Sequence, residues 1–443
     1  MSETEIKNNQ TGNNNRIYSI AHADTMNVYI NKNIVNVKNC FANISSALLS
    51  YRSSFVDNVR IDRNITKTLY DFCCQDIKDD KFRIAVLTGS AGMGKSVVMH
   101  DLLELLNADD KIGVLGIKAD RVVNSEGIAP DMIGKVTPLI DLIRKYATTV
   151  DRFVLLVDQI DALSQSMSND RRAINYQDNL IKAVKFIPNA KIVISCRPYD
   201  MQYDPILDEY SRYTKFELTK LTENEVQKVL HDAGIKHDQL GKNLILFLST
   251  PLHLYIYCKL NGSGSFGEDV TLQKMYDKVW SEYIIKEPSK HSLDSRKIKS
   301  LMGVLSDEMF DKQSLFVSFK KYENNYNTEL SYLFSNGIIT IEDDTIQFFH
   351  QSFFDYVYAR MFIDSHKSLA VELNKAHQGL FIRQRVKQIL TYEREVDKEA
   401  YAKHLEEIFY SDCSYRYHIK MLVLTTIGSF SDVLPCEKHF IEE

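Results

Sequence analysis

The sequence predicts an α/β protein: a parallel five-stranded sheet followed by a helical domain, a winged-helix domain and a helical C-terminal region. Short apolar runs alternate with amphipathic helical patterns between residues 82 and 218, as in a parallel sheet that is covered on both faces. Strand patterns stop near residue 220, and helical patterns continue beyond it. Residues 292–363 then have the order helix, helix, hairpin, which is typical of a winged helix.

Length and composition agree with several folded domains. The chain has 443 residues, of which 44% are hydrophobic and 26% charged, so it is neither disordered nor collagen-like over most of its length. Its net charge of −5 gives no bulk electrostatic reason to bind nucleic acid or an anionic membrane. No apolar run approaches the roughly 18–20 residues of a membrane span. The seven cysteines are scattered, which argues against a disulfide framework or a zinc site. We therefore expect a cytoplasmic protein.

Two segments precede the sheet domain. Residues 1–40 are an Asn-rich tail with short strand patterns, and residues 41–80 a helical lead-in. The sheet domain, 81–220, takes its strands from the apolar runs Arg83–Leu87, Ile112–Ile117, Phe153–Val157, Lys191–Ser195 and Lys215–Leu218. Helical patterns between these runs cover Lys95–Leu106, Thr137–Ala147 and Gln177–Phe186.

Three regions follow the sheet domain. The helical domain, 221–290, opens with the capping box Thr222-Glu-Asn-Glu225. Residues 291–363 form the winged-helix domain, and residues 364–443 the helical C-terminal region. The predicted elements of the winged helix are helices at about 293–311 and 327–335, a helix stop at Asn336-Gly337, and a hairpin of Ile338–Ile341 and Thr345–Phe349.

A glycine-rich segment lies between the first strand and the first helix of the sheet domain. It reads Gly89, Ser90, Ala91, Gly92, Met93, Gly94, Lys95 and Ser96, and it matches G-x-x-x-x-G-K-[ST] at every fixed position. Glycines let backbone N–H groups close around phosphate oxygens. Lys95 would supply charge to the β- and γ-phosphates, and the Ser96 hydroxyl would bind Mg²⁺. A Gly-rich turn without a ligand is the alternative, but the strand before it and the helix after it favour a phosphate loop that binds ATP or ADP with Mg²⁺.

Two acidic residues follow the third apolar run. Asp158 comes directly after Phe153–Val157, at the edge of a parallel sheet where ligands bind. It is therefore the expected Mg²⁺ carboxylate, and Asp161 is placed to polarise the attacking water. The alternatives are a solvated strand-end carboxylate for Asp158 and a helix cap for Asp161.

An arginine follows the fourth apolar run, in the order Ser195, Cys196, Arg197, Pro198. From this neighbouring strand end, Arg197 is placed to reach the γ-phosphate and to report its presence. A surface or ion-paired arginine is the alternative.

Taken in this order, these motifs resemble the NACHT-type branch of the STAND class, which are signal-transduction ATPases of the AAA+-related P-loop group. The resemblance covers about residues 80–363, and it also rests on the segments Phe216–Glu225, Thr250–Leu254 and Phe349–Ala359. It implies that Pro251 packs near the adenine and that His350 contacts the β-phosphate of ADP. Phe55–Arg63 is similar to the family's lead-in, which touches adenine. Without the resemblance, Pro251 is a first-turn helix proline and His350 a histidine at a strand-to-helix turn.

The resemblance implies a switch protein. In the family, ADP holds a resting state, exchange to ATP allows homo-oligomerisation, and hydrolysis resets the switch. The usual roles are innate immunity and regulated cell death, and in bacteria defence against phage. Gln159 and Ala162 stand where the family has a small residue and a further acid, so we expect a slow ATPase. About 80 residues at each end are short for an effector domain or a sensor array, so we expect a truncated chain or separate effector and sensor proteins, with an unknown trigger.

The competing hypothesis is an AAA+-type DNA-binding ATPase that uses its winged helix. A DNA-reading helix carries basic residues, whereas the predicted helix 327–335 has no Lys or Arg and the hairpin tip is Asp343-Asp344. This composition argues against DNA contact by the winged helix. A structural protein with a vestigial phosphate loop is the third hypothesis.

Overall fold

A computed structural model provides the fold and the side-chain contacts. It describes residues 37–50, 59–119, 123–124, 127–128, 139–164, 171–236, 240–260, 270–290, 293–312, 314–342, 344–365, 368–375, 378, 382–410, 415–430 and 432–442. The short strands predicted in residues 17–37 lie outside these residues except for Val37, which is helical, and residues 55–58 of the lead-in Phe55–Arg63 lie outside them as well.

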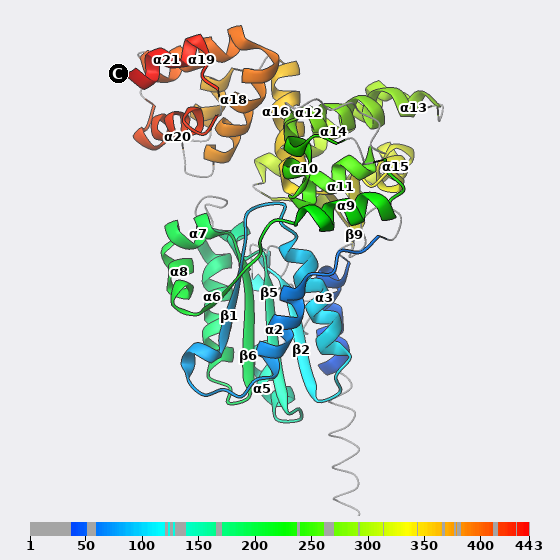
Figure 1. The fold of residues 1–443 in the computed structure, drawn as a ribbon, viewed down its shortest axis with the longest axis vertical. Coiled ribbons are helices and arrows are strands. Elements are labelled where there is room, and N and C mark those ends of the chain that lie inside the picture. Colours follow the sequence, from blue (N-terminus) through cyan, green and yellow to red (C-terminus); the bar gives the residue numbers. More distant parts are fainter. Residues whose placement is uncertain are drawn as a thin grey trace, which may run out of the picture.

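The first structural unit is a parallel sheet (Figure 1). Its strands are β1 (Ile84–Thr88), β2 (Ile112–Lys118), β5 (Arg152–Asp158), β6 (Ala190–Cys196) and β7 (Thr214–Glu217). They pair in the order β2-β5-β6-β1-β7, and all of these pairings are parallel. Each strand begins and ends within one residue of its predicted limits. The predicted α/β fold with a five-stranded parallel sheet is confirmed.

Helices cover both faces of the sheet (Figure 1). On one face, α2 (Asn64–Cys74) and α3 (Lys95–Asn107) share a core with Ala85 and Leu87, whereas α5 (Leu139–Ala147) and α6 (Arg171–Lys185) pack with Ile84 and Val86 on the other. Neighbouring residues of β1 are thus buried on opposite faces, which explains why the strand is apolar throughout. Shorter elements of this unit are η2 (Asp80–Phe82), β3 (Val123–Asn124), β4 (Gly127–Ile128), η3 (Ile160–Leu163), α7 (Pro198–Tyr203), α8 (Pro205–Asp208) and η4 (Glu209–Arg212).

The lead-in contributes a helix beside the edge strand β2. Residues 37–49 are helical, and the Ser45 hydroxyl accepts a hydrogen bond of 2.9 Å from the Gly116 N–H. Phe41 packs with one core of the sheet and Leu48 with the other. The helix therefore shields part of an open sheet edge, whose free N–H groups would otherwise invite pairing with another chain.

A group of helices follows the sheet. It contains α9 (Glu223–Asp232), α10 (Lys242–Leu248), α11 (Pro251–Lys259), α12 (Leu272–Val279), the π-helix η5 (Trp280–Lys286) and α13 (Glu287–Lys290). The predicted capping box opens α9, because the Thr222 hydroxyl accepts from the Glu225 N–H and the Glu225 carboxylate accepts from the Thr222 N–H.

The next segment has the arrangement of a winged helix. Its elements are α14 (Ser295–Asp311), β8 (Val317–Ser318), α15 (Lys320–Ser335), β9 (Ile339–Glu342), β10 (Thr345–Phe348) and α16 (Gln351–Asp364). β8, β10 and β9 form a three-stranded antiparallel sheet. The hairpin and its preceding helix stop lie where the sequence predicts them, and Gly337 has φ +59°.

Two features of the winged helix differ from the prediction. The two-residue strand β8 is too short for a period-two pattern, and α15 begins at Lys320 instead of residue 327. Tyr326 has non-helical angles (φ −136°, ψ 22°), so a kink interrupts the helical period. The predicted segment 327–335 is the part of α15 after this kink, and it has no Lys or Arg. Lys320 and Lys321 lie in the part before the kink, which was not predicted.

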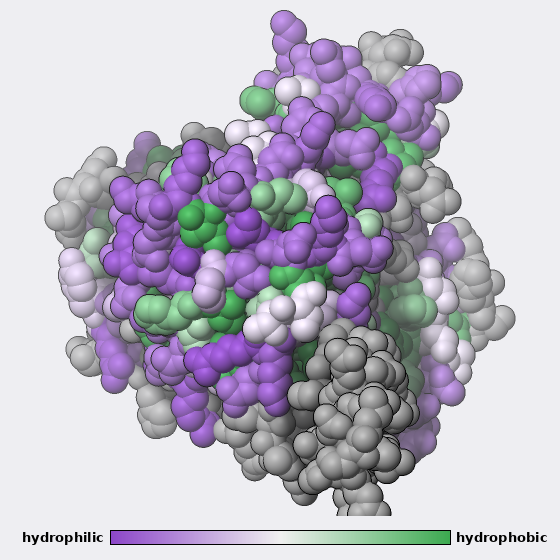
Figure 2. Space-filling model, turned by 90° about the horizontal axis from the view of Figure 1, so that it is seen from below, coloured by the Kyte–Doolittle hydropathy of each residue, from purple (hydrophilic) through white to green (hydrophobic). Residues whose placement is uncertain are grey.

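Among the described residues, the C-terminal region contains the helices α17 (Leu369–Lys375), α18 (Arg383–Val396), α19 (Lys398–Tyr410), α20 (Tyr417–Ile427) and α21 (Pro435–Glu442). A single hydrophobic cluster joins residues from Leu221 to Ile427, so the helices after the sheet share one core. None of the helices in the described part of the chain is long and apolar enough to cross a bilayer. The lower end of the sheet unit has a largely hydrophilic surface with hydrophobic residues in small groups (Figure 2).

Candidate functional site

The phosphate loop connects β1 to α3. Gly92 and Gly94 have φ values of +78° and +90°, which favour residues without a Cβ. Lys95 is 8% exposed, and its ammonium donates to the carbonyl oxygens of Gly89 (2.6 Å) and Ser90 (3.2 Å). Burial lowers the pKa of Lys95, although Asp161 opposes the shift. The buried ammonium is thus held across the loop where a phosphate would need it.

The predicted Mg²⁺ residues lie together behind the loop. Asp158 ends β5 and is fully buried. Its Oδ1 accepts from the Ser195 hydroxyl, and its Oδ2 has no hydrogen-bond partner among the described residues. Burial raises the pKa of Asp158, while the Ser195 and Ser96 hydroxyls oppose the rise. Gln159 donates to Ser96 Oγ at 3.0 Å. A buried carboxylate oxygen beside a hydroxyl suits a hard cation, so this pair fits Mg²⁺.

Asp161 and Arg197 form an ion pair at the same edge of the sheet. Arg197 Nε lies 2.6 Å from Asp161 Oδ2, and Asp161 is in η3, where Gln159 rather than Asp161 is the N-cap. Burial lowers the pKa of Arg197, but the Asp161, Asp200 and Asp355 carboxylates more than offset this, so the pKa is raised. Arg197 therefore stays charged although it is half-buried.

One cavity of about 490 Å³ lies between the phosphate loop and the winged helix. Lys95, Ser96, Asp161 and Arg197 line it from the sheet unit, Pro251 and Leu252 from α11, and Phe348 to Gln351 from the winged helix. The Leu252 N–H donates to the Gly92 carbonyl at 3.1 Å, so the start of α11 holds the loop directly. Pro251 occupies the first turn of α11 and also lines the cavity. The volume is in the range of small-molecule sites.

His350 caps α16 from the cavity wall. Its Nδ1 accepts from the Ser352 N–H at 3.1 Å, so in the neutral imidazole the proton sits on Nε2. Burial, then the Arg197 and Lys95 charges, lowers the pKa of His350 to about 3. His350 is thus a neutral ring with an Nε2–H to donate.

The structure brings most of the predicted site residues into this cavity. Ala91, Gly92, Met93, Gly94, Lys95, Ser96, Asp161, Arg197, Pro251 and His350 line it, whereas Asp158 lies behind it and Gly89 and Ser90 turn their carbonyls to Lys95. Ile61 and Arg63 of the lead-in also line the cavity.

Sequence reasoning missed several polar residues of the cavity, among them Lys118, Gln347 and Gln351. Lys118, which ends β2, donates to Gln347 Oε1 at 3.3 Å, and Arg197 Nη2 donates to Gln351 Oε1 at 2.8 Å. Lys118 directly follows the apolar run Ile112–Ile117, so the rule that selected Asp158 would also have selected it. No sequence signal distinguishes the two glutamines, which flank His350.

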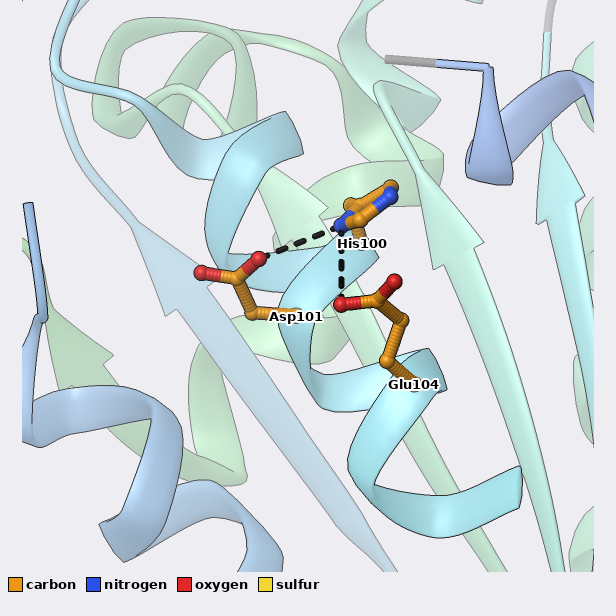
Figure 3. Close-up of side chains that lie close together, drawn as sticks. All are labelled: His100, Asp101 and Glu104. Carbon is orange, nitrogen blue, oxygen red and sulfur yellow. Dashed lines mark hydrogen bonds and ion pairs between the residues drawn. The ribbon is translucent and has the colours of Figure 1, made fainter. Parts of the chain in front are cut away.

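A second polar cluster lies on α3, outside the cavity (Figure 3). His100 Nδ1 is 3.1 Å from Asp101 and 3.9 Å from Glu104, a spacing that a metal ion could bridge. Arg60 already pairs with Asp101 at 2.6 Å and Glu104 at 3.2 Å. We interpret the cluster as an ion-pair network that attaches the lead-in to α3.

Comparisons with known proteins find solved structures with low sequence identity and low structural similarity to this chain. No protein-family model and no curated protein matches the sequence. The Walker-type ATPase paby2304 of Pyrococcus abyssi is 12% identical with a TM-score of 0.36, covering 70% of this chain and 99% of that chain. The Aeropyrum pernix ORC2 protein (ADPNP-ADP complexes) is 13% identical with a TM-score of 0.34, covering 72% and 98%. Domain III of the Thermotoga maritima replication initiation protein DnaA is 15% identical with a TM-score of 0.31, covering 48% and 91%.

These TM-scores are low, and the fold assignment depends instead on the sheet and the phosphate loop. The loop follows β1, and β6 lies between β1 and β5, whose end carries Asp158. The buried lysine, the Ser96 hydroxyl and the Asp158 carboxylate meet at one edge of a parallel sheet, where nucleotides bind in such folds. The chain thus has the fold of a P-loop NTPase, and these residues form its candidate nucleotide site.

Proposed function

We propose that this protein is an ATP- and ADP-binding signal-transduction switch of the NACHT/STAND type that acts in defence signalling. ADP holds the phosphate loop against the winged helix in a resting arrangement, which we call the closed molecule. Exchange to ATP separates them and drives homo-oligomerisation. Hydrolysis is slow and resets the switch.

The proposal gives each site residue a role. The phosphate loop and Lys95 bind the phosphates, and Ser96 and Asp158 hold Mg²⁺. Asp161 orients the attacking water, while Arg197 contacts the γ-phosphate. Pro251 packs near the base, and His350 donates to the β-phosphate of ADP.

The observation that carries the proposal is the cavity shared by the phosphate loop and the winged helix. A ligand shifts a conformational equilibrium only by its different interactions with the two states. A nucleotide bound to Lys95 can also contact His350 in the closed molecule, because both residues line the same cavity there. When the winged helix moves away from the loop, the contact with His350 is lost, so the nucleotide interacts differently with the two states. The neutral Nε2–H of His350 suits a phosphate oxygen, so loss of this contact would favour opening.

The nucleotide site is tested by identifying the nucleotide that the purified protein releases on denaturation. We expect ADP at about one per chain, and no bound nucleotide in Lys95→Ala. Lys111→Ala is the matched control, because Lys111 is exposed at the far end of the sheet unit. Unchanged nucleotide affinity in Lys95→Ala would remove the proposed site.

The switch is tested separately by light scattering. With ADP we expect the mass of one chain, and with Mg²⁺ and a non-hydrolysable ATP analogue a multiple of it. If the protein binds both nucleotides and its mass stays the same, the nucleotide site stands and the switch is wrong.

A DNA-binding ATPase ranks second. The first turn of α15 is basic, but Lys321 Nζ lies 2.6 Å from Glu308 and Lys320 Nζ 3.5 Å from Asp344. These carboxylates neutralise the charge that a DNA phosphate would need. Salt-dependent binding of duplex DNA by the full chain, lost on Lys320→Ala with Lys321→Ala, would reverse the ranking.

A further inference from the structure

We propose that Gln347 and Gln351 act as neutral stand-ins for phosphate oxygens: they hold Lys118 and Arg197 in the closed molecule, and a nucleoside triphosphate takes both cations over. The inference deepens the proposed function and rests on it, since it requires that the cavity binds a nucleotide. It assigns Lys118 as a further phosphate-binding residue.

Lys118 lies at the carboxyl edge of the sheet. It is 3% exposed, it stands opposite Asp158 in the pairing of β2 with β5, and it lines the same cavity as Lys95 and Ser96. Its ammonium donates to Gln347 Oε1 of β10 at 3.3 Å. The Asp158 carboxylate interacts with this charge. Because little water screens the ammonium, it can also attract the phosphate of a bound nucleotide.

Arg197 makes a matching contact from the end of β6. Its Nη2 donates to Gln351 Oε1, in the first turn of α16, at 2.8 Å. Its Nε is occupied by Asp161, so the guanidinium joins the carboxylate and the glutamine at the same time. His350 lies between the two glutamines in the sequence, and all three line the cavity.

The uncharged amide is the important feature of both contacts. Both contacts are already charge-assisted, because Lys118 and Arg197 are cationic donors. A phosphate oxygen adds a negative charge of its own, and the Coulomb attraction between opposite charges is stronger where little water screens it. A γ-phosphate therefore outcompetes an amide oxygen for Lys118 and Arg197, whereas a carboxylate in the amide's place would not yield. ADP lacks the γ-phosphate and leaves both glutamine contacts in place, so the two glutamines make closure sensitive to the third phosphate.

The test replaces each amide by the isosteric carboxylate in the full chain. Affinities for ATP and ADP, both with Mg²⁺, are measured by displacement of a fluorescent ADP analogue. We expect Gln347→Glu with Gln351→Glu to weaken ATP binding about tenfold relative to ADP, because an ion pair then replaces each charge-assisted bond to a neutral amide. Gln347→Ala with Gln351→Ala should shift the ratio the other way. An ATP-to-ADP ratio within twofold of the parent in both double variants would overturn the inference.

Two controls separate pairing from a general charge effect. Gln202→Glu adds the same charge at an exposed position of α7 and should leave the ratio unchanged. In a Lys118→Met background, Gln347→Glu should no longer change the ATP-to-ADP affinity ratio. A double-mutant cycle gives this result when two residues interact directly, because the effect of one substitution then requires the other residue. An equal effect in both backgrounds would refute the pairing. If the parent protein binds neither nucleotide, the proposed function fails first, so the two failures are distinguishable.

Discussion

At the residue scale, the conformation of the phosphate loop depends on the absence of a Cβ atom at Gly92. Gly92 has φ +78°, and a Cβ on it would lie 2.9 Å from Leu252 Cβ. The glycine thus permits both the turn of the phosphate loop and its close contact with α11. Two separate penalties, backbone strain and a steric clash, would follow from any side chain.

We expect Gly92→Ala to destabilise the protein by about 1–3 kcal/mol, the usual cost of a non-glycine residue in such a conformation. ADP affinity should fall with it, because the Leu252 contact holds the loop. The matched control is Gly241→Ala, since Gly241 has φ −61° and open space around its Cα. Thermal unfolding and ADP titration measure both effects. Equal unfolding midpoints for the two variants would contradict this explanation.

His350→Ala should loosen the closed molecule. A hydrogen bond to a charged group contributes about 1.5–3 kcal/mol, so ADP affinity should fall about tenfold or more. Self-association, measured by light scattering at fixed protein concentration, should rise. The matched control is His231→Ala, because His231 is exposed at the end of α9, outside the cavity. A His350→Ala protein that stays monomeric and loaded with ADP would show that the histidine has only its capping role.

The sequence predicted the charged residues of the site better than its neutral ones. Asp158 and Arg197 directly follow apolar strands, and strand order brings them to one edge of the sheet. Gln347 and Gln351 have no such signal, because an amide has many uses and their role depends on which cation faces them. Whether Arg197 meets a phosphate or Asp161 also depends on conformation, which a sequence pattern does not contain.

At the element scale, α16 and the β9–β10 hairpin bring His350 against the sheet unit. The pKa of His350 is lowered from 6.5 to about 3, so the closed arrangement takes up fewer protons than an open one between these values. Lowering the pH through this window therefore favours opening. Burial also lowers the pKa of His253, which acts in the same direction.

We expect the midpoint of thermal unfolding to fall as the pH is lowered from about 7.5 to about 5. The fall should be smaller in His350→Gln, which keeps a neutral side chain at every pH. Differential scanning fluorimetry in matched ionic strength measures both slopes. Parallel slopes for parent and variant would assign the pH dependence to other groups.

Element boundaries were predictable where one pattern ran without interruption. The five strands are short apolar runs between turns, and their limits follow from burial on both faces of the sheet. The part of α15 before the kink at Tyr326 was missed because the kink interrupts the helical period, and β8 was missed because two residues are too few for a pattern. Both errors lie in the winged helix, where long-range pairing with β10 decides the structure.

At the scale of the whole molecule, the sheet unit and the shared core from Leu221 to Ile427 are two bodies with one cavity between them. Their arrangement could not be predicted from the sequence, because it depends on a few polar contacts across the cavity. Those contacts include Lys118 with Gln347, Arg197 with Gln351, and the Leu252 N–H with the Gly92 carbonyl. These few hydrogen bonds contribute about 1–3 kcal/mol each, so one phosphate group that competes for them can change which arrangement is favoured.

The final prediction concerns the shape of the full chain in solution. With ADP, small-angle scattering should give the radius of gyration of the closed molecule. With Mg²⁺ and a non-hydrolysable ATP analogue, the radius of gyration of the single chain should increase, because the two bodies separate before chains associate. Dilution series distinguish this opening from assembly, since opening within one chain does not depend on concentration. Gln347→Glu with Gln351→Glu should keep the compact form at an analogue concentration that opens the parent. An unchanged radius in the parent with analogue bound would mean that the third phosphate does not move the winged helix, and that closure is a fixed property of the fold.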